Sequence, residues 1–180
     1  MHPESDPLDR AADTLLALAA ERPWPDISLR AVAEAAGLPL TELYASANSK
    51  AALLAHLSAR FDRAALATAA TASDDAHDRL FDAVMARVEA MEPHRAALTA
   101  IARAAGPLAL VAHFPPTARA ILEAAGLDAN PPRLAAMTAL WARIAQVWRD
   151  DEGALNRTMA EIDKRLKQMR SRLGRIGAGF

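Results

Sequence analysis

Residues 27–50 read ISLRAVAEAAGLPLTELYASANSK, and this stretch decides the fold. Apolar residues follow a helical period on both sides of Gly37: Leu29, Val32, Ala33 and Ala36 before it, and Leu40, Leu43 and Tyr44 after it. Glycine adopts the left-handed conformation that ends one helix and turns the chain into the next. Ser28 and Ser49 each precede a helical run and are expected to act as N-caps. The stretch therefore predicts a helix-turn-helix.

The flanking sequence extends this pair of helices into an all-α chain. A helix is expected from Leu8 to Glu21, stopped by the prolines at positions 23 and 25, and a long helix from Ala51 to about Ala70. Only 4% of the 180 residues are aromatic although 52% are hydrophobic, and the excess is alanine, the strongest helix former. No alternating β-branched run is long enough for a strand. We predict an N-terminal three-helix unit over residues 1–63 and a larger helical domain over residues 64–180.

The second half carries two amphipathic stripes. They comprise Leu80, Phe81, Val84, Met85, Val88 and Met91, and then Leu134, Met137, Trp141, Ile144 and Trp148. Such stripes form core by default, but methionine fills irregular spaces and tryptophan can form a pocket wall. Both interpretations stay open, and the residues proposed for a ligand pocket are Phe81, Met85, Met137, Trp141 and Trp148. Between the stripes, His113–Pro116 is expected to be a break before a brief helix from Thr117 to Ala125.

The last helix is amphipathic and basic. Its apolar residues repeat at steps of three and four: Met159, Ile162, Leu166, Met169, Leu173 and Ile176. Six cations and no acid follow Asp163: Lys164, Arg165, Lys167, Arg170, Arg172 and Arg175. Sustained spacing of this kind is typical of a dimer seam, whereas a basic flank beside an apolar stripe suits an anionic membrane surface. A solvated face over ordinary core is the third alternative.

The composition argues against several function classes. Without cysteine, the chain has no disulfide, no thiolate metal ligand and no thiol nucleophile. The five histidines fit no helical ligand-pair spacing, and no nucleophile elbow, phosphate-binding loop or dinucleotide-binding glycine pattern occurs. The adjacent acids of Asp150–Glu152 lack a further set of metal ligands and are expected at the start of the last helix. We expect no enzyme activity, no metal and no cofactor.

Charge and hydropathy bear on location and partners. The N-terminal MHPESDPLDR is acidic and lacks the apolar segment of a secretory signal, and the longest uncharged run, Ala104–Ala118, is too short and too interrupted by proline to span a bilayer. A cytoplasmic location is expected. Residues 1–63 carry six Lys or Arg against nine Asp or Glu, a net charge of −3 in a chain whose total is −1. That is the wrong sign for binding phosphates.

The order of the N-terminal elements resembles the DNA-binding unit of the TetR family of bacterial transcriptional regulators. The resemblance covers about the first third of the chain, with Gly37, Leu43-Tyr44 and Ser49-Lys50 where the family pattern has them. It implies a TetR-like homodimeric repressor whose recognition helices, about Leu40 to Ala47, enter successive major grooves of double-stranded operator DNA. It also implies a small apolar ligand in the C-terminal helices that releases the DNA.

The same resemblance implies DNA contacts at individual residues. The expected set is Ser28, Arg30, Leu40, Thr41, Tyr44, Ala45, Ser46 and Lys50. Of these, Ser28, Tyr44 and Lys50 would touch phosphates, whereas Thr41, Ala45 and Ser46 would lie nearest the bases. The reading helix departs from the family pattern, because Pro39-Leu40 stands where a small polar residue and a basic one are frequent. Each missing cation lowers the affinity for DNA.

A second resemblance concerns residues 147–166, VWRDDEGALNRTMAEIDKRL, which are similar to the C-terminal part of the lipid-binding accessory proteins of ubiquinone biosynthesis. Those proteins share the TetR-like fold without binding DNA. The resemblance implies an apolar lipid cavity, a partner hydroxylase and a terminal amphipathic helix on the membrane, for which Met159–Ile176 is suited. We take the regulator as the main hypothesis because its frame is longer and better matched, and keep the accessory protein as the alternative.

Overall fold

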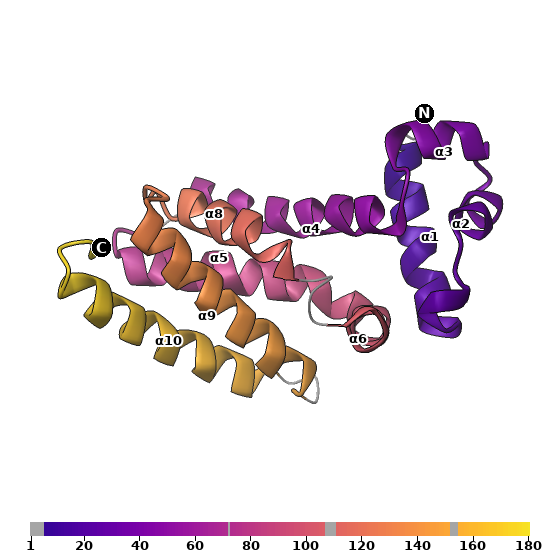
Figure 1. Cartoon of the computed structure of the whole chain (residues 1–180). Coiled ribbons are helices and arrows are strands. Elements are labelled where there is room, and N and C mark those ends of the chain that lie inside the picture. Colours follow the sequence, from indigo (N-terminus) through magenta and orange to yellow (C-terminus); the bar gives the residue numbers. More distant parts are fainter. Residues whose placement is uncertain (1–5, 72, 107–110, 152–154) are drawn as a thin grey trace. The chain divides into compact units, whose positions relative to one another are not determined.

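The computed structural model of the chain describes residues 6–71, 73–106, 111–151 and 155–180, and within these ranges it contains helices and no strand (Figure 1). The all-α prediction is confirmed. The chain divides into two compact units, Met1–Arg60 with His94–Leu110, and Phe61–Pro93 with Val111–Phe180. Among the described helices, none combines the length and the apolar character that crossing a bilayer requires.

The first unit is a small helical bundle. Its elements are α1 (Pro7–Glu21), the 3-10 turn η1 (Trp24–Asp26), α2 (Leu29–Ala36), α3 (Leu40–Ser46), the first part of α4 (Lys50–Ala67) and α6 (Arg95–Ala105). Helix α1 packs against α2, α3 and α6. The fully buried side chains of this unit include Leu15, Ile27, Leu43, Leu53, Leu57 and Ile101.

The place of α6 differs from the expected division of the chain at residue 63. This helix lies beyond that boundary in sequence, yet it packs against α1 and η1 of the first unit. Its buried face, which carries Ala97, Ile101 and Ala102, explains the grouping, because apolar area must be covered by a neighbouring element. The boundary between residues 63 and 64 stays a prediction about functional domains.

Local signals set the helix ends. The Ser28 hydroxyl accepts the Ala31 N–H at 3.1 Å at the start of α2, and the Ser49 hydroxyl accepts the Ala52 N–H at 3.1 Å at the start of α4. Both predicted N-caps are therefore confirmed, and each satisfies a backbone donor that the first helical turn leaves without a partner.

The second unit contains the remainder of α4, η2 (Thr68–Thr71), α5 (Ala76–Met91), α8 (Phe114–Ala124), α9 (Pro131–Arg149) and α10 (Asn156–Gly174). The 3-10 turn η3 (Glu92–His94) follows α5. Helix α9 packs between α8 and α10, and α5 packs against the same two helices (Figure 1). The fully buried side chains of the second unit include Leu80, Ile121, Leu122, Met137, Ile144 and Ile162.

The break expected at His113–Pro116 is confirmed only at its first residue, because the chain turns at Ala112 and His113. Helix α8 begins at Phe114, so that Pro115 and Pro116 occupy its first turn. Proline is tolerated there because the first N–H groups of a helix have no intrahelical acceptor and the fixed φ of proline is already helical.

The apolar stripe of α10 is used inside the chain. Ile162, Leu166, Met169 and Leu173 are at most 5% exposed, on a helix that packs against α9 and α5. The expectations of a dimer seam or a membrane-inserted face on this stripe are therefore wrong, and the alternative of a solvated face over ordinary core is confirmed. Only Met159 and Ile176, at the two ends of the stripe, are exposed.

Candidate nucleic-acid interface and ligand-binding core

The turn between α2 and α3 has the geometry of a helix-turn-helix. Gly37 has φ +65°, and the Leu38 N–H donates to the Ala33 carbonyl oxygen at 2.9 Å, which closes the end of α2. A Cβ at Gly37 would meet nothing within 4 Å, so the backbone conformation, rather than lack of space, is what favours glycine here. Leu38 is buried directly after the turn.

Helix α3 presents one face to the core and another to solvent. Leu43 and the following Ala47 are each 2% exposed, whereas Tyr44 is 59% exposed. Thr41, Ala45 and Ser46 are also exposed, and Leu40 is half-buried. The three residues expected to lie nearest the bases are therefore all accessible to solvent.

The members of the expected DNA-contacting set that lie outside α3 differ in how accessible their side chains are. Arg30 is exposed on α2, and Ser28 is exposed beside it with one acceptor position of its hydroxyl used in the cap. Lys50 is half-buried and donates from Nζ to the Trp24 carbonyl oxygen at 2.6 Å, with Nζ 4.3 Å from the centre of the Trp24 ring. Desolvation lowers the pKa of Lys50, and the nearby Asp26 carboxylate opposes this. To reach a phosphate, Lys50 must give up or share this contact.

Ion pairs connect α1 and α4 within the first unit. Asp9 on α1 lies 2.7 Å from His56 Nε2, and Asp13 accepts from Arg60 Nη2 at 2.6 Å. The hydrogen bond to Asp13 raises the pKa of Arg60. The charge of Arg60 is thus neutralised within the unit. His56 pairs with Asp9, as expected for a histidine that belongs to no set of metal ligands.

The residues expected to form a ligand pocket lie in the core of the second unit. Met85 on α5, and Met137, Trp141 and Trp148 on α9, are buried, and Phe81 is half-buried. The Trp148 indole N–H donates to a Glu92 carboxylate oxygen at 2.8 Å. Their clustering on α5 and α9 agrees with both the core and the pocket interpretations, so the pocket stays a prediction.

The core of the second unit also contains a cluster of buried charged and polar side chains that the sequence patterns did not predict. Arg87 on α5 is 4% exposed and donates from Nε to Asp62 Oδ1 of α4 at 2.6 Å. The Thr117 hydroxyl of α8 donates to the same oxygen at 3.0 Å, and the guanidinium carbon lies 4.3 Å from the centre of the Trp141 ring. Desolvation lowers the pKa of Arg87, against the opposing effect of Asp62.

A signal for this cluster exists in the sequence. Positions 80, 84, 87 and 91 share the helical spacing of the apolar stripe, so an arginine at position 87 faces the core and must have a partner there. Nothing local identifies that partner, because Asp62 precedes Arg87 by 25 residues. His113, half-buried nearby, has its pKa lowered by desolvation and by the charge of Arg87.

One of the acids before α10, Asp151, has a structural role. Asp151 is buried, and its carboxylate accepts from both the backbone N–H and the hydroxyl of Thr158, at 2.9 and 2.8 Å. This caps the first turn of α10, as the helix-start interpretation expected. Asp150 is exposed, and Glu152 lies outside the described residues. Among the described residues there is no group of three or more histidines and carboxylates that could hold a metal ion.

Solved structures share this architecture along nearly the whole chain. A TetR transcriptional regulator from Rhodococcus sp. RHA1 aligns over 91% of this chain and 94% of its own, with a TM-score of 0.65 and 18% identity. The chain has the TetR-like fold. The predicted fold is therefore confirmed, including the N-terminal helix-turn-helix and the helical region that follows it.

Two further solved structures align with the chain over a similar length. The dihydroxyacetone kinase operon activator DhaS aligns over 93% of this chain and 96% of its own, with a TM-score of 0.60 and 8% identity. The fatty acid degradation regulator FadR from Bacillus halodurans aligns over the same shares, with a TM-score of 0.54 and 15% identity. No family model matches the sequence, and no curated protein is significantly similar to it. At these identities the likeness establishes the fold alone.

Proposed function

We propose that this chain is a DNA-binding transcriptional regulator that reads operator DNA with α3. The observation that carries the proposal is the outward face of α3, where Thr41, Tyr44 and Ala45 are exposed on a helix held by the buried Leu43 and by the turn at Gly37. A short helix presented in this way fits the major groove of duplex DNA. The TetR-like fold of solved regulators supports the same assignment.

Each residue of the proposed interface has a defined chemical role. Hydroxyl groups of Thr41 and Ser46 can bond base edges, and the small Ala45 can contact a thymine methyl group. Leu40, half-buried at the start of α3, would supply an apolar contact. The phosphate contacts would come from the set Ser28, Arg30, Tyr44 and Lys50, with Arg30 as its exposed cation.

We further propose a homodimer that binds two half-sites and leaves the DNA when a small apolar ligand enters the second unit. A two-fold dimer places two copies of α3 in successive major grooves one helical turn apart. The ligand would contact Phe81, Met85, Met137, Trp141 and Trp148. Release requires that the ligand bind the DNA-free conformation more tightly than the DNA-bound one. This role needs no catalytic residue, and the α10 stripe that a membrane-bound accessory protein would insert is buried.

The test is binding of the purified chain to its own upstream DNA, measured by fluorescence anisotropy across a salt series. Thr41→Ala should weaken binding to the preferred site by about tenfold, since one base contact contributes about 1–3 kcal/mol of discrimination. Thr99→Ala on α6 deletes the same chemical group elsewhere in the first unit and should leave binding unchanged. Equal binding of the upstream DNA and of shuffled sequence would overturn the proposal.

A further inference from the structure

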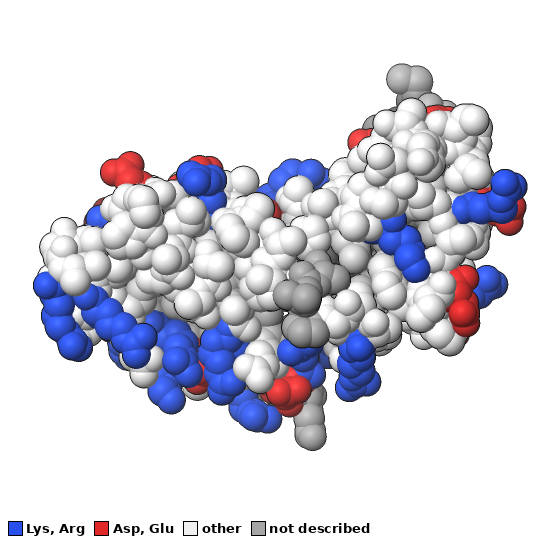
Figure 2. Space-filling model, in the orientation of Figure 1, with Lys and Arg blue, Asp and Glu red and all other residues white. Residues whose placement is uncertain are grey.

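The solvent side of α10 carries a row of polar and cationic side chains opposite its buried stripe. These residues follow one another at steps of three and one: Lys164, Lys167, Gln168, Ser171, Arg172 and Arg175. We call this set the outer face of α10. Gln168 is half-buried and the other five are exposed. Figure 2 shows Lys and Arg gathered along the part of the second unit where Figure 1 places α10.

The positive charge of this face is only partly neutralised. Within it, Lys167 donates to Asp163 at 2.7 Å. Arg165, which lies outside this set, donates to Glu161 at 2.7 Å. From residue 164 to residue 180 the sequence contains no acid. The outer face therefore keeps a net positive charge along its whole length.

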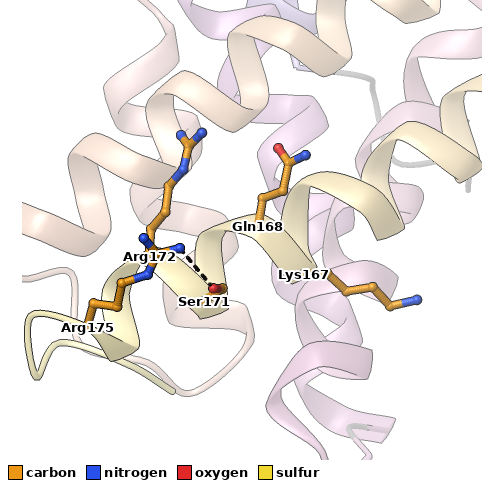
Figure 3. A pocket seen from close by; sticks show the side chains of 5 residues that line it. All are labelled: Lys167, Gln168, Ser171, Arg172 and Arg175. Carbon is orange, nitrogen blue, oxygen red and sulfur yellow. Dashed lines mark hydrogen bonds between the residues drawn. The ribbon is translucent and has the colours of Figure 1, made fainter.

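The guanidinium groups at the C-terminal end of the face border a solvent-open hollow of about 370 Å³. It is lined by Lys167, Gln168, Ser171, Arg172 and Arg175, and Arg175 donates to the Ser171 hydroxyl at 3.4 Å (Figure 3). Guanidinium, ammonium, amide and hydroxyl donors around one hollow are the groups that bind phosphate oxygens. The hollow thus has the donor chemistry of a phosphate contact.

We propose that the outer face of α10 binds the phosphate backbone of duplex DNA without regard to sequence. Its cations extend from Lys164 to Arg175, about 16 Å at 1.5 Å per residue, whereas one DNA strand carries a charge about every 3.4 Å along the axis. A row of this length spans several phosphates, more than a single small anion offers. The face has no aromatic side chain on which unpaired bases would stack, which favours a duplex over a single strand.

The outer face of α10 lies on a different helix from α3, and it would supply the positive charge that the first unit lacks. Residues 1–63 have a net charge of −3, so the reading helix has little electrostatic attraction for DNA of its own. Cations on α10 contribute affinity that is independent of base sequence. The buried apolar stripe leaves no extended apolar face on α10 for insertion into lipid.

The experiment measures binding of the full chain to a random-sequence duplex across a salt series. The variant K164Q/R172Q/R175Q removes three cations of the outer face. The control R63Q/R119Q/R149Q removes the same charge from exposed arginines elsewhere in the second unit. Log K falls with log salt by about 0.9 for each phosphate neutralised, so the variant should make this slope shallower by about 2.7. The control should keep the slope of the unmodified chain. Unchanged far-UV circular dichroism verifies folding.

The proposal would be overturned if the variant and the unmodified chain had equal slopes, or if the control lost as much slope as the variant. It would also be overturned if pyrophosphate displaced the bound duplex as readily as unlabelled duplex DNA does. Attachment to phosphatidylserine vesicles without any binding of the duplex would overturn it as well. The test is distinct from that of the reading helix. If upstream and random DNA bind equally but the α10 variant still loses salt dependence, the proposed regulator function is rejected and the proposed DNA-binding surface on α10 is supported.

Discussion

The buried pair of Asp62 and Arg87 allows a quantitative test of how the second unit is held together. Asp62→Leu replaces the carboxylate with an apolar group and leaves the Arg87 guanidinium, which is 4% exposed, without this anion at 2.6 Å. Removing one member of a buried pair costs about 3–5 kcal/mol. For a chain of 180 residues this corresponds to a fall in Tm of roughly 6–20 °C.

The partner substitution reverses most of this loss. Asp62→Leu combined with Arg87→Met removes both charges and leaves apolar side chains in a core that already contains Phe61 and Trp141. The remaining cost should be about 1–3 kcal/mol, because the Thr117 hydroxyl loses the carboxylate oxygen it bonds at 3.0 Å. The double variant is therefore expected to be more stable than the single one.

Urea unfolding followed by tryptophan fluorescence measures both variants. The chain has three tryptophans, and in a Trp24→Phe background only Trp141 and Trp148 remain, both in the second unit. The signal then reports the unit that contains the pair. A loss below about 1 kcal/mol for Asp62→Leu, or a double variant no more stable than the single one, would refute the reasoning that the charge is buried and dependent on its partner.

Three further predictions concern single positions. Gly37 and Gly126 have φ of +65° and +68°, so replacing either with alanine should lower the free energy of unfolding by about 1 kcal/mol, measured by thermal unfolding. Only Gly37→Ala should also weaken DNA binding, and equal effects of the two substitutions on DNA binding would contradict the proposed role of the turn. The pKa of His113 lies below its ordinary 6.5 in the folded chain, so the unfolded chain takes up this proton first as the pH falls. Tm should therefore decrease as the pH drops below 6.5, and this decrease should be smaller for His113→Gln. An equal decrease in both proteins would contradict the prediction. Asp151→Ala removes two hydrogen bonds at the first turn of α10 and should destabilise the chain by about 1–3 kcal/mol in urea unfolding, whereas the exposed Asp150→Ala should change little.

Local sequence predicted the helix boundaries of the N-terminal unit well. Ser28, Gly37 and Ser49 act through groups no more than five residues away, because caps and a left-handed turn bond only to the adjacent helical turn. The period of α3 predicts its faces only in part, because it groups Tyr44 with Leu40 and Leu43, whereas the structure leaves Tyr44 59% exposed. The error at Pro115 and Pro116 is also local, since a proline pair is compatible with either a break or a first turn.

The sequence by itself thus determined that this chain is helical and where its helix-turn-helix lies. Only the tertiary structure decided which partners the long-range groups take. It paired Arg87 with Asp62, placed Lys50 on Trp24, and buried the stripe of α10 against α9 and α5. An amphipathic stripe specifies that it must be covered, but any apolar surface can cover it, so its partner is chosen by the packing of the whole chain.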